Sequence, residues 1–256
     1  GSVNLTPLDV ANAYAILANG GYRVSPYVMD RIFGADGEML YAADPLIACA
    51  VCEDEAAQAA RAAEEEATQA ARQAFRSANG KRPASSIPDE PIQHAPSVIS
   101  RQNAWLVADM MRDVVRRGTG RRAMQLGRKD LSGKTGTTNE RRDAWFSGFN
   151  ADIVGTAWVG FDQERPLGAR EEGSRTALPM WIDFMREAMA GVPDRVLPKP
   201  PGLVTARISP ESGELARPGE YGAIFETFRV GHVPELAQDT TESPYEQIEE
   251  EEEILF

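Results

Sequence analysis

The chain has 256 residues, of which 42% are hydrophobic, and its formal net charge is −12. This length and composition are typical of a soluble globular protein that can bury a sizeable core, and no apolar run is long enough to span a bilayer. The acidic balance argues against nucleic acid as the main partner. The chain begins Gly1-Ser2-Val3 without a basic or apolar leader, so we expect no signal peptide within it and either a cytosolic protein or a piece of a longer one.

Residues 1–43 predict a helix followed by a hairpin. Thr6-Pro7-Leu8-Asp9 supplies a hydroxyl N-cap, a proline at the first helical position and an acid in the first turn. Gly20-Gly21 is expected to end this helix. The runs 22–33 and 39–41 are joined through Gly34-Ala35-Asp36-Gly37, which favours a hairpin.

Residues 44–97 are interpreted as an insertion. Ala, Glu and Gln dominate residues 53–74, which can form a helix from propensity but have little to bury, and four prolines in 79–96 suit a surface loop. Cys49 and Cys52 precede this stretch with C-x-x-C spacing. A zinc site would need two more ligands nearby, and a redox motif would need a βαβ context, so a local disulfide or inert thiols are favoured.

Residues 98–197 predict the main α+β region. An amphipathic helix ends before Gly118, and the runs 131–138, 144–149 and 153–161 then predict an antiparallel meander. A further helix is expected over 176–189. The fold class is therefore α+β, with an antiparallel sheet flanked by helices.

Residues 198–256 are expected to form an extension with one strand at 203–208 and an acidic tail. Six glutamates crowd residues 246–253, which is typical of a solvated segment. Arginines gather instead between residues 112 and 128, where a solvated helix end and loop is favoured over an anion-binding patch. These arginines are Arg112, Arg116, Arg117, Arg121, Arg122 and Arg128.

The strongest chemical signal is Lys134-Thr135-Gly136-Thr137-Thr138, at the end of a predicted strand. No G-x-x-x-x-G-K precedes it, so it is not a Walker A loop. K-T-G is one of the three motifs of penicillin-binding proteins and β-lactamases, with S-x-x-K and an S-x-N-type element. An ammonium and threonine hydroxyls can bind a carboxylate, and the glycine leaves the strand open to a peptide ligand.

Several further stretches accompany K-T-G. Together, the chain resembles the C-terminal part of the transpeptidase domain of class A, bifunctional penicillin-binding proteins of the 1A type from Gram-negative bacteria. The matching stretches are Leu5-Thr6-Pro7-Leu8-Asp9-Val10-Ala11, Ala18-Asn19-Gly20-Gly21-Tyr22, Cys49-x-x-Cys52, Gly118-Thr119-Gly120-x-x-Ala123, Gly133 to Asn139, Asp143-Ala144-Trp145-Phe146-Ser147-Gly148, Trp158-Val159-Gly160-Phe161-Asp162 and Ile254-Leu255-Phe256.

The resemblance implies a penicillin-binding, β-lactamase-like transpeptidase fold and a role for each site residue. Lys134 would belong to the charge network around the nucleophile, and the Thr137 N–H would resemble an oxyanion donor. Asp143 and Trp145 would line the cleft, with packing favoured for Trp145. The substrate-binding residues implied are Thr135, Gly136, Thr137, Thr138, Asp143 and Trp145.

The chain departs from the family pattern because no serine is followed three residues later by lysine. Ser77-Ala78-Asn79 has the S-x-N form but lies in the insertion, so we reject it. The nucleophile, its lysine, the middle motif, a glycosyltransferase domain and a membrane anchor are expected upstream of Gly1. This chain alone is expected to be inactive.

The resemblance implies D-Ala-D-Ala stem peptides and β-lactams as ligands, with no metal or organic cofactor. The expected partners are the upstream part of the same protein and other cell-wall synthesis proteins. The expected location is the periplasmic face of the inner membrane. Two alternatives remain: a non-catalytic scaffold of cell-wall synthesis, and a β-lactamase-like hydrolase, which the long segment after K-T-G disfavours.

Overall fold

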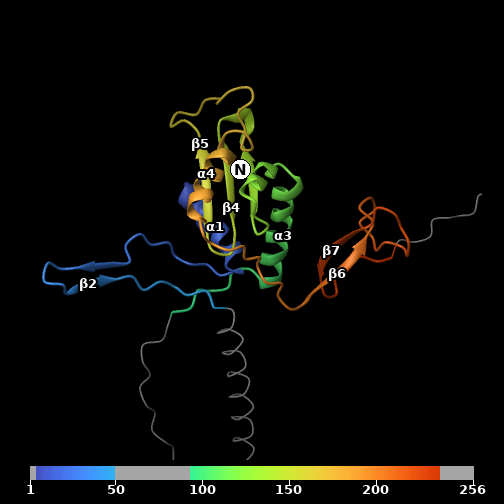
Figure 1. The fold of residues 1–256 in the computed structure, drawn as a ribbon, viewed down its shortest axis with the longest axis horizontal. Helices are drawn as coiled ribbons and strands as arrows, with labels where there is room; N and C mark the ends of the chain where they lie inside the picture. Colours follow the sequence, from blue (N-terminus) through green and yellow to red (C-terminus); the bar gives the residue numbers. More distant parts are fainter. Residues whose placement is uncertain (1–3, 50–92, 237–256) are drawn as a thin grey trace, which may run out of the picture. The chain divides into compact units, whose positions relative to one another are not determined.

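The computed structural model describes residues 4–49 and 93–236, and the chain divides into two compact units, Gly1–Pro198 and Lys199–Phe256. The first unit combines helices with antiparallel strands, which confirms the α+β class (Figure 1). Within the described residues, no helix has the length and apolar character needed to cross a membrane.

Helix α1 spans Pro7–Ala18 and begins as predicted. The Thr6 hydroxyl accepts the Asp9 N–H at 3.2 Å, and the Asp9 carboxylate accepts the Thr6 N–H at 3.0 Å, forming a capping box. The chain then turns at Gly20 and Gly21, both with positive φ. A Cβ at Gly21 would lie 2.2 Å from the Ile99 carbonyl oxygen, so only glycine allows the chain to pass there.

Strands β1 (Arg31–Phe33) and β2 (Met39–Ala42) form the predicted hairpin. The chain then pairs with the segment that returns from residue 93: the Ile47 N–H donates to the Gln93 carbonyl at 3.0 Å, and the Ala95 N–H donates to the Ile47 carbonyl at 2.9 Å. Cys49 is disulfide-bonded. Cys52, the predicted alanine-rich helix and the Ser77-Ala78-Asn79 string lie outside the described residues, as does the acidic tail.

Helix α3 (Arg101–Arg117) and the short helix η1 (Arg121–Leu126) precede the central sheet. The sheet has the order β3-β4-β5, with β3 at Ser132–Thr137, β4 at Ala144–Phe149 and β5 at Val154–Val159. A turn labelled η2 (Asn139–Arg141) joins β3 to β4, and helix α4 (Ala177–Ala188) follows β5. Both strand pairs are antiparallel, so the predicted meander is confirmed.

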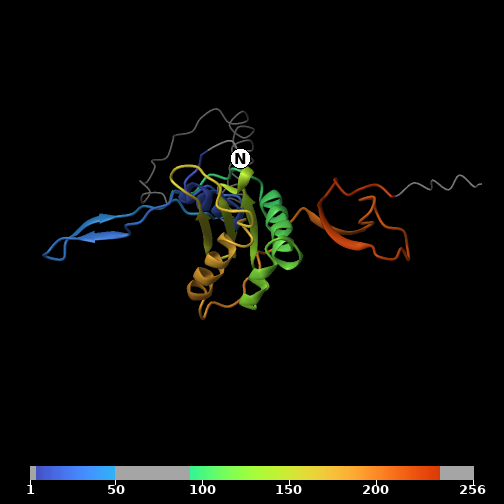
Figure 2. The ribbon, with the colours of Figure 1, turned by 90° about the horizontal axis from the view of Figure 1, so that it is seen from above.

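Helices α1 and α4 cover opposite faces of this sheet (Figures 1 and 2). Phe146 packs against Trp181 of α4 with ring centroids 4.9 Å apart, whereas Phe149 meets Tyr14 of α1 at 6.2 Å. Side chains three apart on a strand point to opposite faces. The buried core lies on the α4 side and comprises Val115, Ala123, Leu131, Ala144, Phe146, Ala177, Leu178, Trp181, Ile182, Met185 and Met189.

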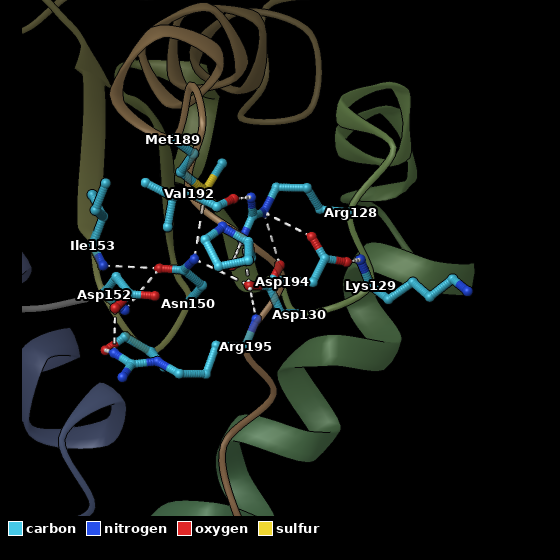
Figure 3. Close-up of polar contacts among 12 residues, drawn as sticks. Arg128, Lys129, Asp130, Asn150, Asp152, Ile153, Met189, Val192, Asp194 and Arg195 are labelled. Carbon is cyan, nitrogen blue, oxygen red and sulfur yellow. Dashed lines mark hydrogen bonds and ion pairs between the residues drawn. The ribbon is translucent and has the colours of Figure 1, made fainter.

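A buried polar network fixes the start of β3 (Figure 3). The Arg128 guanidinium donates to both Asp130 oxygens at 2.9 and 2.7 Å, and also to the Val192 and Pro193 carbonyls. The expectation that Arg128 lies in a solvated loop is therefore wrong: it is only 9% exposed. The spacing of the arginines along the sequence could not show that the chain after α4 returns to cover Arg128.

The second unit contains a strand pair rather than one strand. β6 (Leu203–Ile208) was predicted, and β7 (Ile224–Arg229) pairs with it antiparallel along its whole length. β7 was missed because its alternating pattern is short and lies among proline, glycine and acidic residues.

Candidate functional site

Strand β3 carries the K-T-G sequence along an open sheet edge, since within the described residues it pairs with β4 alone. The Thr138 N–H donates to the Asp143 carbonyl across the β3–β4 pair at 3.2 Å. In an antiparallel pair, the backbone groups of successive residues alternate between the partner strand and the opposite side. The N–H and C=O groups of Thr135 and Thr137 therefore face the open edge.

Lys134 is exposed near this edge. Its ammonium donates to the Thr135 carbonyl at 2.8 Å and lies 3.5 Å from the Thr135 hydroxyl. It has no carboxylate partner among the described residues. The positive charge thus lies on the strand edge and remains available to an anionic ligand.

The threonine hydroxyls are held by two segments distant in sequence. The Thr119 and Thr135 hydroxyls lie 2.8 Å apart, which fixes the turn after α3 against β3. The Gly173 N–H donates to the Thr137 hydroxyl at 3.1 Å. Sequence reasoning matched Thr119 to the family without assigning it a contact, and it missed Gly173 altogether.

Gly136 and Gly173 allow backbone to lie close to backbone at the middle of β3. A Cβ at Gly136 would contact the Trp145 Cβ at 3.0 Å. A Cβ at Gly173 would lie 2.3 Å from the Trp145 carbonyl oxygen and 2.6 Å from that of Gly136. The segment before α4 therefore packs closely against the backbone of Gly136 and Trp145.

Asp143 holds the turn at the end of β3 together. Its carboxylate accepts hydrogen bonds from the Trp158 indole at 2.9 Å and from the Thr138 hydroxyl at 3.3 Å, while its own N–H donates to that hydroxyl at 2.8 Å. Trp145 is half-buried, and its ring lies 5.9 Å from that of Trp158. In this structure, both residues and Thr138 support the geometry of the strand end.

The family model described as the penicillin binding protein transpeptidase domain matches residues 1–161, which include β3 and β4. The chain belongs to this family.

Individual relatives agree with the family match. Penicillin-binding protein 1A from Pseudomonas aeruginosa is 44% identical over 241 residues, and that from Neisseria gonorrhoeae is 32% identical over 265. The crystal structure of penicillin-binding protein 1A from Haemophilus influenzae aligns with a TM-score of 0.74 at 32% identity, covering 93% of this chain and 34% of that one.

The matches cover 91% and 95% of this chain, but only 29% and 28% of the Pseudomonas and Neisseria proteins. The chain therefore spans less than a third of the length of these curated relatives.

Strand β3 of this chain offers the Lys134 ammonium, the hydroxyls of Thr135 and Thr137, and the backbone N–H groups of these two threonines at one open edge. Such an edge can accept an extended peptide as an added strand, with main-chain hydrogen bonds for affinity and Lys134 for a terminal carboxylate. Within the described residues, no group of three His, Cys, Asp or Glu side chains is placed to hold a metal ion.

Proposed function

We propose that this chain is the K-T-G-bearing part of a serine-type D,D-transpeptidase that crosslinks peptidoglycan and is acylated by penicillin. The observation that carries the proposal is the open edge of β3, where Lys134 and the backbone of Thr135 and Thr137 face outward. Members of the family are transpeptidases, and the relatives named above are penicillin-binding proteins.

Each residue of the edge then has a role. Lys134, Thr135 and Thr137 bind the terminal carboxylate of the stem peptide or of a β-lactam, and Lys134 also belongs to the charge network around the nucleophile. The Thr137 N–H stabilises the oxyanion that forms when the carbonyl is attacked. Gly136 keeps the strand clear of side chains beneath the peptide, with Thr138, Asp143 and Trp145 fixing the strand end.

The reaction is an acyl transfer in two steps. A serine hydroxyl outside this chain attacks the penultimate D-alanine carbonyl, an ester forms, and the terminal D-alanine leaves with a proton on its amine. The amine of a neighbouring stem peptide then attacks the ester, forms the crosslink and returns the hydroxyl to the serine. Because this chain has no S-x-x-K string, it is a fragment that is inactive alone.

The parent protein in this proposal also carries a glycosyltransferase domain and a membrane anchor, and it acts on the periplasmic face of the inner membrane. The test is to treat the full-length product of the gene with a fluorescent penicillin and to map the adduct by peptide mass spectrometry. We expect one adduct, on a serine outside residues 1–256 that is followed three residues later by lysine. Absence of an adduct would refute the enzyme and leave a scaffold.

A further inference from the structure

The turn after β3 is strained. Glu140 has φ 58° and ψ 11°, and Arg141 has φ 54°. Of the residues that the structure describes, these are the two non-glycine residues with positive φ, and they are consecutive. The left-handed conformation costs an ordinary side chain about 1–2 kcal/mol, and strain of this kind is concentrated at functional sites.

Four contacts hold the turn in this conformation. The Arg141 N–H donates to the Thr138 carbonyl at 3.0 Å, and the Leu167 N–H donates to the Arg141 carbonyl at 2.9 Å. Arg142 forms ion pairs with Glu140 at 2.6 Å and Glu164 at 3.0 Å. The conformation is thus set by the surroundings rather than by the preference of the two residues.

The two consecutive arginines at this turn, Arg141 and Arg142, differ in their contacts. Arg142 is occupied by two carboxylates, but the Arg141 side chain is exposed and has no ion pair or hydrogen bond among the described residues. The Arg141 backbone N–H is hydrogen-bonded to the carbonyl of Thr138, the last residue of the K-T-G-T-T sequence. An exposed guanidinium beside this strand adds positive charge to the local field that an anionic ligand meets.

We propose that the strained turn presents Arg141 as a second carboxylate-binding subsite, for an acidic group on the peptide other than the terminal carboxylate bound by Lys134. This inference rests on the proposed function, because the ligand is the stem peptide or a β-lactam bound along β3. A planar guanidinium suits a carboxylate through paired hydrogen bonds. The substrate class is therefore a D-alanyl peptide with an additional carboxylate near its reacting end.

The test compares two penicillins on the full-length protein. Benzylpenicillin has one carboxylate, whereas α-carboxybenzylpenicillin has a second one on its side chain. The measured quantity is the ratio of their second-order acylation rate constants, at low and at high salt. The variant is Arg141→Asn, because asparagine accepts the left-handed conformation and removes the charge without straining the turn further.

The ratio is taken as the rate constant of α-carboxybenzylpenicillin divided by that of benzylpenicillin. We expect Arg141→Asn to lower this ratio about three-fold at low salt, and less at high salt, as for an exposed charge pair. Arg141→Lys should retain part of the preference. Arg23→Gln removes an exposed arginine outside this turn and serves as the matched control, so its ratio should equal that of the wild type. An Arg141→Asn ratio equal to the wild-type ratio would overturn the subsite.

The two proposals fail in different ways. If neither penicillin acylates the wild-type protein, the transpeptidase proposal itself is wrong. If both acylate it and Arg141→Asn slows them equally, the turn positions β3 and does not bind the second carboxylate, so the subsite alone is refuted.

Discussion

Replacing Asp130 by asparagine should loosen the anchor of the K-T-G strand. The Asp130 side chain is fully buried two residues before β3 and accepts four hydrogen bonds. Two come from Arg128, one from the Asn150 amide at 3.1 Å and one from the Arg195 N–H at 3.0 Å. These bonds join the start of β3, the end of β4 and the chain after α4 (Figure 3).

Asparagine keeps the shape of the side chain but loses its charge and turns one acceptor into a donor. Arg128, about 10% exposed, would keep two carbonyl partners and Asp194 at 3.5 Å. Breaking a buried ion pair on one side costs about 3–5 kcal/mol, and the remaining partners favour the lower value, about 3 kcal/mol. For a unit of this size, this corresponds to a fall in Tm of roughly 6–12 °C.

The assay is thermal melting of the full-length protein, combined with hydrogen exchange of peptides covering residues 128–137 and 190–197. Exchange should rise in both peptides. Asp183→Asn, which breaks an exposed ion pair with Arg186, is the control and should cost less than about 1 kcal/mol. Equal Tm values for Asp130→Asn and Asp183→Asn would refute the role of the network.

The contribution of Asp130 to folding stability should fall in acid. Burial alone would raise the pKa of Asp130, but the hydrogen bonds from Arg128, Arg195 and Asn150 hold it below its ordinary value. Its contribution to stability is therefore full above the unfolded-state pKa, near 4, and is lost as the pH falls through the folded-state pKa. The difference in stability between wild type and Asp130→Asn should be constant from pH 7 to 5 and shrink in stronger acid.

Two further substitutions test the packing around β3. Gly173→Ala places a methyl group 2.3 Å from a backbone oxygen, so it should displace the segment before α4, cost about 1–3 kcal/mol and slow penicillin acylation. Gly191→Ala is the control: its Cβ meets nothing within 4 Å, so it should cost only the strain of its positive φ, about 1–2 kcal/mol, and leave acylation unchanged. Wild-type acylation by Gly173→Ala would contradict the close approach. Trp181→Phe leaves a cavity and removes the hydrogen bond from the Trp181 indole to the Gly155 carbonyl, so Tm should fall by an amount equivalent to about 2 kcal/mol. Exposed Glu187→Gln is the neutral comparison, and an unchanged Tm for Trp181→Phe would show that this site repacks.

Local signals in the sequence were sufficient for the elements that position the site. Thr6 and Asp9 marked the start of α1, and alternating residues between short turns marked β3, β4 and β5. K-T-G was placed on a strand because threonine and its neighbours favour extended backbone. These features depend on residues within a few positions of one another, so one sequence contains them.

Contacts between distant segments were not predictable in the same way. The Thr119–Thr135 hydroxyl pair and the Gly173 contact with Thr137 join segments separated by 16 and 36 positions. Arg128 looked like its solvated neighbours, because its partner Asp130 is buried only when the chain after α4 returns. Neither of the two left-handed residues, Glu140 and Arg141, is a glycine or an asparagine, so the sequence did not predict this conformation.

The pairing of Ile47 with Gln93 and Ala95 brings the two ends of a long segment to one point on the surface of the first unit. A chain that leaves and re-enters a domain at adjacent positions adds little loop-closure entropy as it lengthens, since each doubling costs only about 0.6 kcal/mol. Evolution can therefore vary the length of residues 50–92 without altering the K-T-G strand. The same point is a suitable place to graft a reporter domain into the protein.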